Sequence, residues 1–170
     1  HVKNFEAFIE AQLNYQNPDP ELRSKIDVLI SHLDDRGYLL EDLESIVSDT
    51  KEGYRPWLKA LRFIQEELEP AGLGARDLQE CLLIQTYRMG DGFEREIHLL
   101  VHHFEQLKIN KLDVMAEESG YSIEEVVESL EFFKNLNFRP AASFFEEKAR
   151  HLSPDATVKY DPPDLLRENG

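Results

Sequence analysis

Residues 69–83 read EPAGLGARDLQECLL, and this stretch joins a turn rich in proline and glycine to a run of apolar residues. Pro70 is expected to end the preceding helix, since proline lacks the backbone N–H that a helix needs. Gly72 and Gly74 suit the unusual backbone angles of a tight turn. The apolar run predicts a helix over about residues 75–89. Because it is apolar on several faces, we expect this helix at the centre of a first helical bundle.

Apolar residues also recur at helical spacing before this stretch. Asp19 and Pro20 suit the N-cap and first residue of a helix, and Gly37 suits a left-handed C-cap that closes it. Pro56 is expected to open a further helix that Pro70 ends. The apolar stripes are Phe5, Phe8, Ile9 and Leu13, then Leu22, Ile26, Leu29, Ile30 and Leu33, then Trp57, Leu58, Leu61, Ile64 and Leu68.

The segment Met89–Gly92 contains two glycines and an aspartate, so it is the best candidate for a domain boundary. Beyond it, residues 93–107 are expected to form one long amphipathic helix, and residues 111–118 a short one. Ser122 and Glu125 have the spacing of a capping box, which predicts another helix start.

These patterns predict an all-α fold of two tandem helical bundles. Residues 1–90 form the N-terminal bundle, and residues 91–137 form a three-helix unit of helix-turn-helix type. Residues 138–170 are expected to be an irregular tail or linker, because helical periodicity fades after Leu136. Within this tail only Thr157–Tyr160 looks like a strand.

The charge of the chain bears on its partners. Its 170 residues include 34 acidic and 19 basic ones, a formal net charge of −15. Binding to bare phosphate backbone requires clustered lysine and arginine, so direct nucleic-acid binding is disfavoured. No run approaches the ~18 apolar residues of a membrane helix, and we expect a cytoplasmic protein without membrane contact. Because residue 1 is His rather than Met, we expect a piece of a longer protein.

No catalytic constellation stands out. His98 and His102 lie one helical turn apart, but with His103 they fall on the polar face, where solvent exposure is the simpler interpretation. The acidic pairs at 34–35 and 66–67 diverge along a helix instead of converging on a substrate. We therefore predict no metal, no cofactor and no enzymatic activity; a metal-dependent helical enzyme is the weakest alternative.

Cys81 is the only cysteine, which excludes an intramolecular disulfide. It lies in an apolar helix with no histidine beside it in the sequence. A buried structural thiol is therefore expected.

Residues 112–136 have the order of a helix-turn-helix: a short helix, a turn with glycine and a second helix. A DNA-reading second helix would present basic or amide side chains to the groove. The predicted exposed positions are instead Glu124, Glu125, Glu128, Glu131 and Asn135, with Lys134 as the one cation. A packing unit is favoured, and a DNA-binding regulator is the alternative.

Several strings together resemble the core-polymerase-binding region of bacterial sigma-54 factors. They are residues 33–39 (LDDRGYL), residues 69–83 and residues 136–140 (LNFRP), and their order matches from about residue 3 to residue 160. The 69–83 string is the most specific of them. The chain departs from the family at residues 137–141, which read NFRPA where the family usually has Asn-Pro-Arg-Pro-Gly.

The resemblance implies a helical bundle that docks on core RNA polymerase, followed by a three-helix unit. The family's activator-responsive region, promoter-reading helix-turn-helix and C-terminal signature box are absent from these residues. Promoter DNA would therefore be bound only through other parts of a longer protein. We expect a monomeric protein–protein adaptor without catalysis.

Candidate contacts with the polymerase lie at two interhelical turns and at the start of the helix after the second. They are Asp34, Asp35, Tyr38, Arg76, Asp77, Gln79 and Glu80. The turns themselves are expected to depend on Gly37, Pro70, Gly72 and Gly74. Internal capping and packing would explain the same residues, and the sequence leaves both interpretations open.

Overall fold

A computed structural model describes residues 2–145 of the chain. Every regular element in this range is a helix, which confirms the all-α prediction. Most of the predicted tail, including Thr157–Tyr160, lies outside the described residues. In chain order the helices are α1 (Val2–Gln16), α2 (Pro20–Ser31), α3 (Leu43–Ser48), α4 (Tyr54–Glu67), α5 (Leu78–Arg88), α6 (Glu94–His102), α7 (Phe104–Lys108), α8 (Leu112–Ser119) and α9 (Ile123–Lys134).

Local capping sets two helix starts as predicted. The Asp19 carboxylate accepts a hydrogen bond of 3.0 Å from the backbone N–H of Leu22, and α2 begins at Pro20. Ser122 and Glu125 form the complete capping box of α9, with hydrogen bonds of 3.1 and 2.9 Å. Both caps satisfy N–H groups that the first helical turn leaves free.

Three helix limits differ from the predictions. α4 begins at Tyr54, two residues before the predicted start at Pro56. At the other two limits, turns take up residues assigned to helices. α2 ends at Ser31, so Gly37, with φ of +98°, belongs to the turn after the helix and not to its C-cap. α5 begins only at Leu78, after the extended N-cap Asp77, whereas the apolar pattern placed its start near Ala75.

The predicted single helix over 93–107 is also wrong, since it breaks at His103 into α6 and α7. His103 is buried and leaves the helical region, with φ of −131°. The break lets Phe104 and Leu107 of α7 join the same core as α8 and α9.

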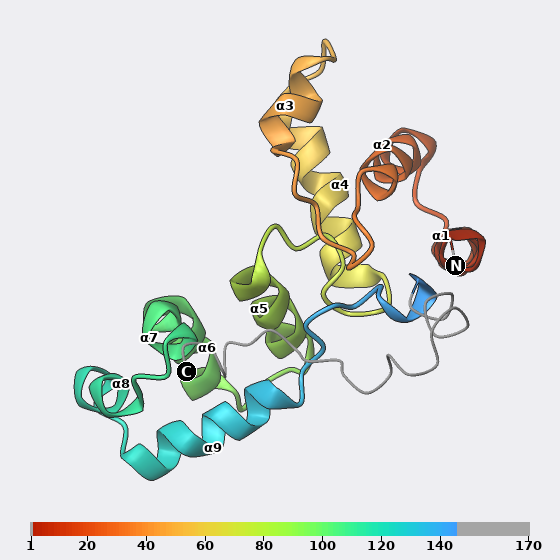
Figure 1. The fold of residues 1–170 in the computed structure, drawn as a ribbon. Helices are drawn as coiled ribbons and strands as arrows, with labels where there is room; N and C mark the ends of the chain where they lie inside the picture. The colour runs from red at the N-terminus through yellow and green to blue at the C-terminus, as the bar shows by residue number, and fades with distance from the viewer. Residues whose placement is uncertain (1, 146–170) are drawn as a thin grey trace.

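The buried apolar residues fall into two large clusters. The first cluster unites α1–α4 with Leu73 and Ala141, and the second unites Leu82 of α5 with α6–α9 and Phe138. Figure 1 shows α1–α4 on one side of the molecule and α5–α9 on the other. A third, small cluster contains Tyr38, Ala75, Cys81 and Ile84.

The position of α5 corrects the expectation that it occupies the centre of the first bundle. Its face with Leu82 packs in the second cluster, while Cys81 and Ile84 point into the third. An apolar helix can be covered on several sides by different partners, so its composition did not identify them. The division of the chain into domains at residues 90 and 137 stays a prediction.

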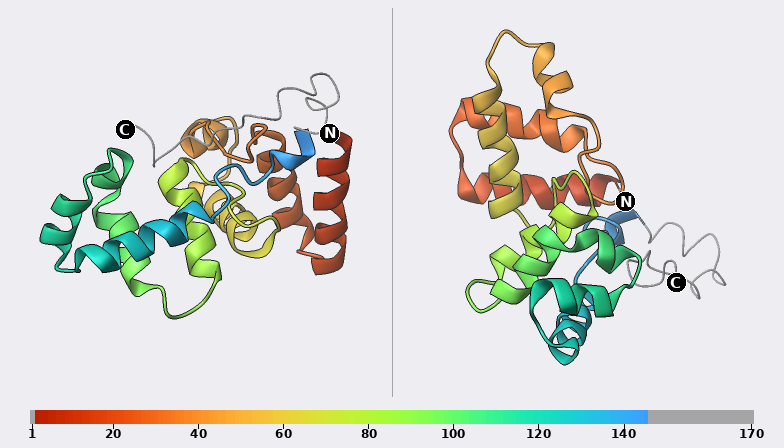
Figure 2. Two further views of the ribbon diagram at one scale, coloured as in Figure 1. Left: turned by 60° about the horizontal axis from the view of Figure 1, so that its bottom comes forward. Right: turned by 90° about the vertical axis from the view of Figure 1, so that its left-hand side faces the viewer.

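The chain returns to its starting point after α9. Residues 137–145 run back toward the beginning of α1, as the views in Figures 1 and 2 agree. The ring of Phe144 lies 5.3 Å from that of Phe5 and 5.4 Å from that of Phe8. The first residues of the predicted tail are therefore packed against the N-terminal helix.

No helix among the described residues combines the length and the apolar character needed to cross a membrane.

Candidate functional site

Three segments that are far apart in the sequence meet between the two large clusters. They are residues 34–39, residues 70–77 and residues 137–142, and we call their meeting point the junction. Backbone hydrogen bonds of 2.9 Å run from Gly74 N to Gly37 O and from Leu39 N to Ala75 O. A third, of 2.8 Å, runs from Ala141 N to Arg36 O. The structure thus unites the strings on which the sequence-based hypothesis depends.

Asp34 organises the turn after α2. Its Oδ1 accepts hydrogen bonds from the backbone N–H groups of Arg36 and Tyr38, at 2.9 and 3.0 Å. Its Oδ2 accepts two more from the Arg36 guanidinium. Burial alone would raise the pKa of Asp34, but the hydrogen bonds from Tyr38 and Arg36 outweigh it and hold this pKa below its ordinary value. Asp35, by contrast, is exposed.

Tyr38 is buried in the junction and serves an internal purpose there. Its hydroxyl donates a hydrogen bond of 2.7 Å to the backbone oxygen of Phe138. The Arg36 guanidinium lies over the Tyr38 ring, 4.2 Å from its centroid. Burial raises the pKa of Tyr38 well above its ordinary value, so the hydroxyl stays protonated as a donor.

Gln85 is a junction residue that the sequence interpretation missed. Its buried amide donates to Asn137 O at 2.7 Å and accepts from Asn137 N at 2.8 Å. One helical turn earlier lies Cys81, fully buried as expected, and burial raises the pKa of its thiol to about 11. The sequence did contain one sign of Gln85: it is a polar residue in an otherwise apolar helix, four residues after Cys81 and therefore on the same helix face.

The glycines let the junction segments approach one another. Gly37 and Gly72 have φ of +98° and +108°, in the region that favours glycine. A Cβ on Gly37 would lie 2.7 Å from Leu73 Cδ2, and one on Gly72 would lie 2.8 Å from Pro140 Cγ. A Cβ on Gly74, where φ is +79°, would lie at the longer distance of 3.1 Å from Ile64 Cγ2.

The start of α5 carries a compact charged cap. The Asp77 carboxylate accepts a hydrogen bond of 2.8 Å from Glu80 N, as a helix N-cap does. Glu80 in turn accepts from Arg76 three times, at 2.8, 2.9 and 2.7 Å. Burial would raise the pKa of Glu80, but the bonds from Arg76 hold it below its ordinary value.

The seven candidate contact residues therefore differ in accessibility. Gln79 reaches across to α6, where its amide donates to Leu100 O at 2.8 Å. Tyr38 is buried, and Asp34, Gln79 and Glu80 are half-buried. Asp35, Arg76 and Asp77 are exposed, which leaves them the most accessible of the candidates. Their contact with a partner stays a prediction.

The three neighbouring histidines pack on one another. The His98 ring lies 4.7 Å from that of His102 and 5.5 Å from that of His103. His103 is buried beside Gln106, and His98 is half-buried, so the expectation of three exposed histidines was wrong. Burial lowers the pKa of His98, as do the two neighbouring imidazoles. Among residues 2–145 no group of His, Cys, Asp or Glu side chains is arranged to hold a metal ion.

The outer face of α9 is acidic, as predicted. Ile123 and Val127 of α9 are exposed as well, and the exposed polar residues are Glu124, Glu125, Glu128, Glu131, Lys134 and Asn135. Arg95 of α6 reaches two of the carboxylates, at 2.8 Å for Glu128 and 3.8 Å for Glu125. This face is repulsive toward phosphate, which argues against the DNA-binding alternative.

Replacing Asp34 with alanine is expected to lower the free energy of unfolding by about 1–2 kcal/mol at pH 7, because two backbone N–H groups lose their acceptor. The pKa of Asp34 is lowered in the folded state, so its stabilising effect is present at neutral pH and lost as pH falls through that pKa. Urea unfolding of the wild type and the variant measures the loss of stability at pH 7 and its disappearance in acid.

The matched control for this experiment is the exposed neighbour, Asp35→Ala. It is expected to change the free energy of unfolding by less than about 0.5 kcal/mol at either pH. Equal losses for the two variants would contradict the assigned role of Asp34.

The chain has relatives among bacterial transcription factors. It is 30% identical to the RNA polymerase sigma-54 factor of Bacillus subtilis over 162 residues, which cover 92% of this chain and 37% of that protein. It is 31% identical to the RNA polymerase sigma-54 factor of Acinetobacter guillouiae over 153 residues, covering 79% of this chain and 32% of that protein. The chain thus spans about a third of the length of these curated relatives.

A family model also relates almost the whole chain to sigma-54 factors. Residues 1–166 match the model described as "Sigma-54 factor, core binding domain". This range contains the junction, both large clusters and the charged cap of α5. The chain belongs to the family of sigma-54 factor core binding domains.

Proposed function

We propose that this chain binds core RNA polymerase and acts as a non-catalytic adaptor within a sigma-54 transcription initiation factor. The observation that carries the proposal is the match to the core binding domain over residues 1–166. The relatives that support it are themselves named RNA polymerase sigma-54 factors.

The described residues fit an adaptor better than an enzyme. General acid–base chemistry needs two groups aimed at one point. Asp34 is instead committed to its own turn, while its neighbour Asp35 is exposed. The carboxylates of Asp77 and Glu80 are likewise engaged with the start of α5.

The remaining parts of the proposal concern the longer protein. Promoter DNA would be contacted through parts of it other than this chain, since the exposed face of α9 is acidic. The chain would bind the polymerase as a monomer, in the cytoplasm where transcription takes place.

The proposal predicts that the purified chain binds core RNA polymerase but does not bind promoter DNA by itself at physiological salt. A pull-down with core polymerase, repeated in competition with a full-length sigma-54 factor, measures the first part. A mobility-shift assay measures the second, down to low salt where phosphate binding would be strongest.

The control is an unrelated helical protein of similar size and negative charge. Non-specific attraction between an acidic protein and basic surfaces weakens as salt is added, and the control would report it. A chain that neither binds core polymerase beyond this control nor competes with the full-length factor would overturn the proposal.

A further inference from the structure

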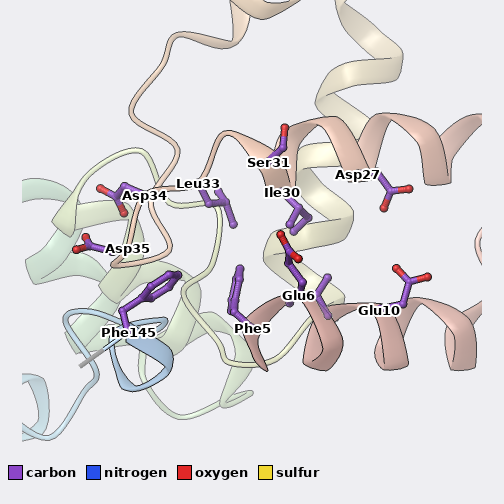
Figure 3. A pocket seen from close by; sticks show the side chains of 11 residues that line it. Phe5, Glu6, Glu10, Asp27, Ile30, Ser31, Leu33, Asp34, Asp35 and Phe145 are labelled. Atoms are coloured by element: carbon purple, nitrogen blue, oxygen red, sulfur yellow. The ribbon is translucent and has the colours of Figure 1, made fainter. Parts of the chain in front are cut away.

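A groove of about 440 Å³ runs between α1 and α2. Figure 3 shows Phe5 of α1 and Ile30 of α2 directed into it, with Phe145 at one end. Ile9 and Leu33 complete its apolar lining. Several of these side chains also belong to the edge of the first cluster, so the groove has a packed floor.

Every charged side chain that lines this groove is acidic. The carboxylates come from α1, from α2 and from the turn that follows α2: Glu6, Glu10, Asp27, Asp34 and Asp35. Figure 3 shows Glu10 and Asp27 opposite each other on the two helices. A low-dielectric wall lined by one sign of charge concentrates the electric field and attracts the opposite charge.

Only part of this charge is neutralised by neighbouring arginines. Arg23 pairs with Glu10 at 2.7 Å and with Asp27 at 3.5 Å, and Arg36 pairs with Asp34 at 3.0 Å. No ion pair is found for Glu6 or Asp35 with the side chains described among residues 4–145. Within this part of the chain the groove therefore keeps a net negative charge.

The acidic lining is a local feature and does not simply follow from the net charge of the chain. A second groove, of about 390 Å³ between α2 and α4, is lined by Arg55, Lys59 and Arg62 as well as by two glutamates. The two grooves share α2 but differ in charge. A partner could thus distinguish them by electrostatics alone.

We infer that the groove between α1 and α2 binds a basic amphipathic segment of a protein partner. Apolar side chains of that segment would pack on the half-buried Ile30 and Leu33, and its lysines or arginines would lie beside Glu6 and Asp35. The apolar floor favours a peptide over a simple cation, and the carboxylates repel ligands that carry phosphate. The inference rests on the proposed function in taking core RNA polymerase as the source of the segment.

The test is the double variant Glu6→Lys/Asp35→Lys, which reverses the charge of the two lining carboxylates that pair with no side chain described among residues 4–145. Two ligands are used: core RNA polymerase, and a synthetic amphipathic peptide with leucines on one face and lysines on the other. The variant is expected to bind both ligands about tenfold more weakly or worse, since each reversal replaces attraction by repulsion. Backbone amide shifts of the wild-type chain should change at α1 and α2 on adding the peptide.

The matched control is Asp91→Lys/Glu117→Lys, which makes the same change in net charge at exposed positions outside the groove. It should weaken binding less than about twofold at physiological salt, because distant exposed charges are screened. Circular dichroism and urea unfolding show whether each variant is folded, and Glu6→Gln/Asp35→Asn is the milder replacement if the first is not.

Each outcome is decisive. Peptide binding at the groove without any polymerase binding would support the groove and overturn the proposed function. If the groove variant and the control variant weakened polymerase binding equally, the groove would not be the binding site, and the proposed function would still hold. Two further outcomes would identify this chain itself as the occupant of the groove and overturn the inference. One is a change in the amide shifts of α1 and α2 when the chain self-associates. The other is an affinity for the peptide that rises when residues 146–170 are deleted.

Discussion

Replacing Gly37 with alanine is expected to lower the free energy of unfolding by about 2–4 kcal/mol. At φ of +98° a side chain costs about 1–2 kcal/mol in backbone strain. The new Cβ would also lie 2.7 Å from Leu73 Cδ2 and 3.2 Å from Ala141 Cβ, both on fully buried residues. Overpacking of this kind costs about 1–3 kcal/mol, partly offset by the lower entropy of the unfolded alanine variant.

Urea unfolding followed by fluorescence measures this loss in the relevant part of the fold. Trp57 is the only tryptophan of the chain and is buried in the first cluster, which contains Leu73 and Ala141. A loss of stability should move the unfolding midpoint to lower urea without changing the slope of the transition.

Gly92→Ala is the matched control, because Gly92 has the same φ of +98° with no atom within 4 Å of its Cβ position. It should cost only the backbone strain, about 1–2 kcal/mol. The difference between the two variants then isolates the close approach of the junction segments. Equal losses would mean that the approach of Leu73 and Ala141 to Gly37 contributes nothing.

The parts of the fold that depend on local interactions were predictable from the sequence. Asp19 and Ser122 cap helices through N–H groups only three residues away, so a short pattern contains the whole interaction. The left-handed turns at glycine are local in the same way. The acidic outer face of α9 followed from helical periodicity alone.

The parts that depend on distant partners were not predictable in this way. Gln85 pairs with Asn137 across 52 residues of sequence, and Tyr38 with Phe138 across 100. Nothing near Gln85 indicates that its partner is the backbone of Asn137. The break at His103 also depends on packing, because residues 93–107 keep a helical apolar pattern through it.

The sequence predicted which segments form the candidate site, but not what each side chain in them does. The resemblance identified residues 33–39 and 69–83, and the structure places them side by side. Most of the named side chains there have internal partners, as Asp34, Tyr38 and Gln79 do. A side chain that bonds within this chain can also contact the polymerase. The two roles have to be separated by variants that keep the contact within the chain.

Arg76→Glu is expected to weaken binding to core RNA polymerase about tenfold or more, because the sequence predicts Arg76 as a polymerase contact. Arginine is among the residue types that dominate protein interfaces, and the Arg76 side chain is 46% exposed. The variant alone is ambiguous, because it also breaks the ion pair with Glu80 and places two carboxylates at positions 76 and 80, beside the start of α5.

The charge swap Arg76→Glu/Glu80→Arg separates the two roles. It restores an ion pair between positions 76 and 80, which lie on either side of the N-cap Asp77. Stability in urea should therefore return toward that of the wild type, with a deficit of about 1 kcal/mol from the lost hydrogen bond between Arg76 N and Glu80 and from arginine near the helix N-terminus. Binding to core polymerase should remain weak, because the exposed cation at position 76 is still absent.

The corresponding swap on α9, Glu131→Lys/Lys134→Glu, exchanges another exposed pair and should leave binding unchanged. The two swaps make no change in net charge, so a difference between them cannot come from long-range attraction. If the Arg76 and Glu80 swap restored binding together with stability, Arg76 would act only through the cap of α5. Weak binding by a stable swapped variant would instead place the guanidinium of Arg76 at the interface, since the swap restores the ion pair between positions 76 and 80 but not the cation at position 76.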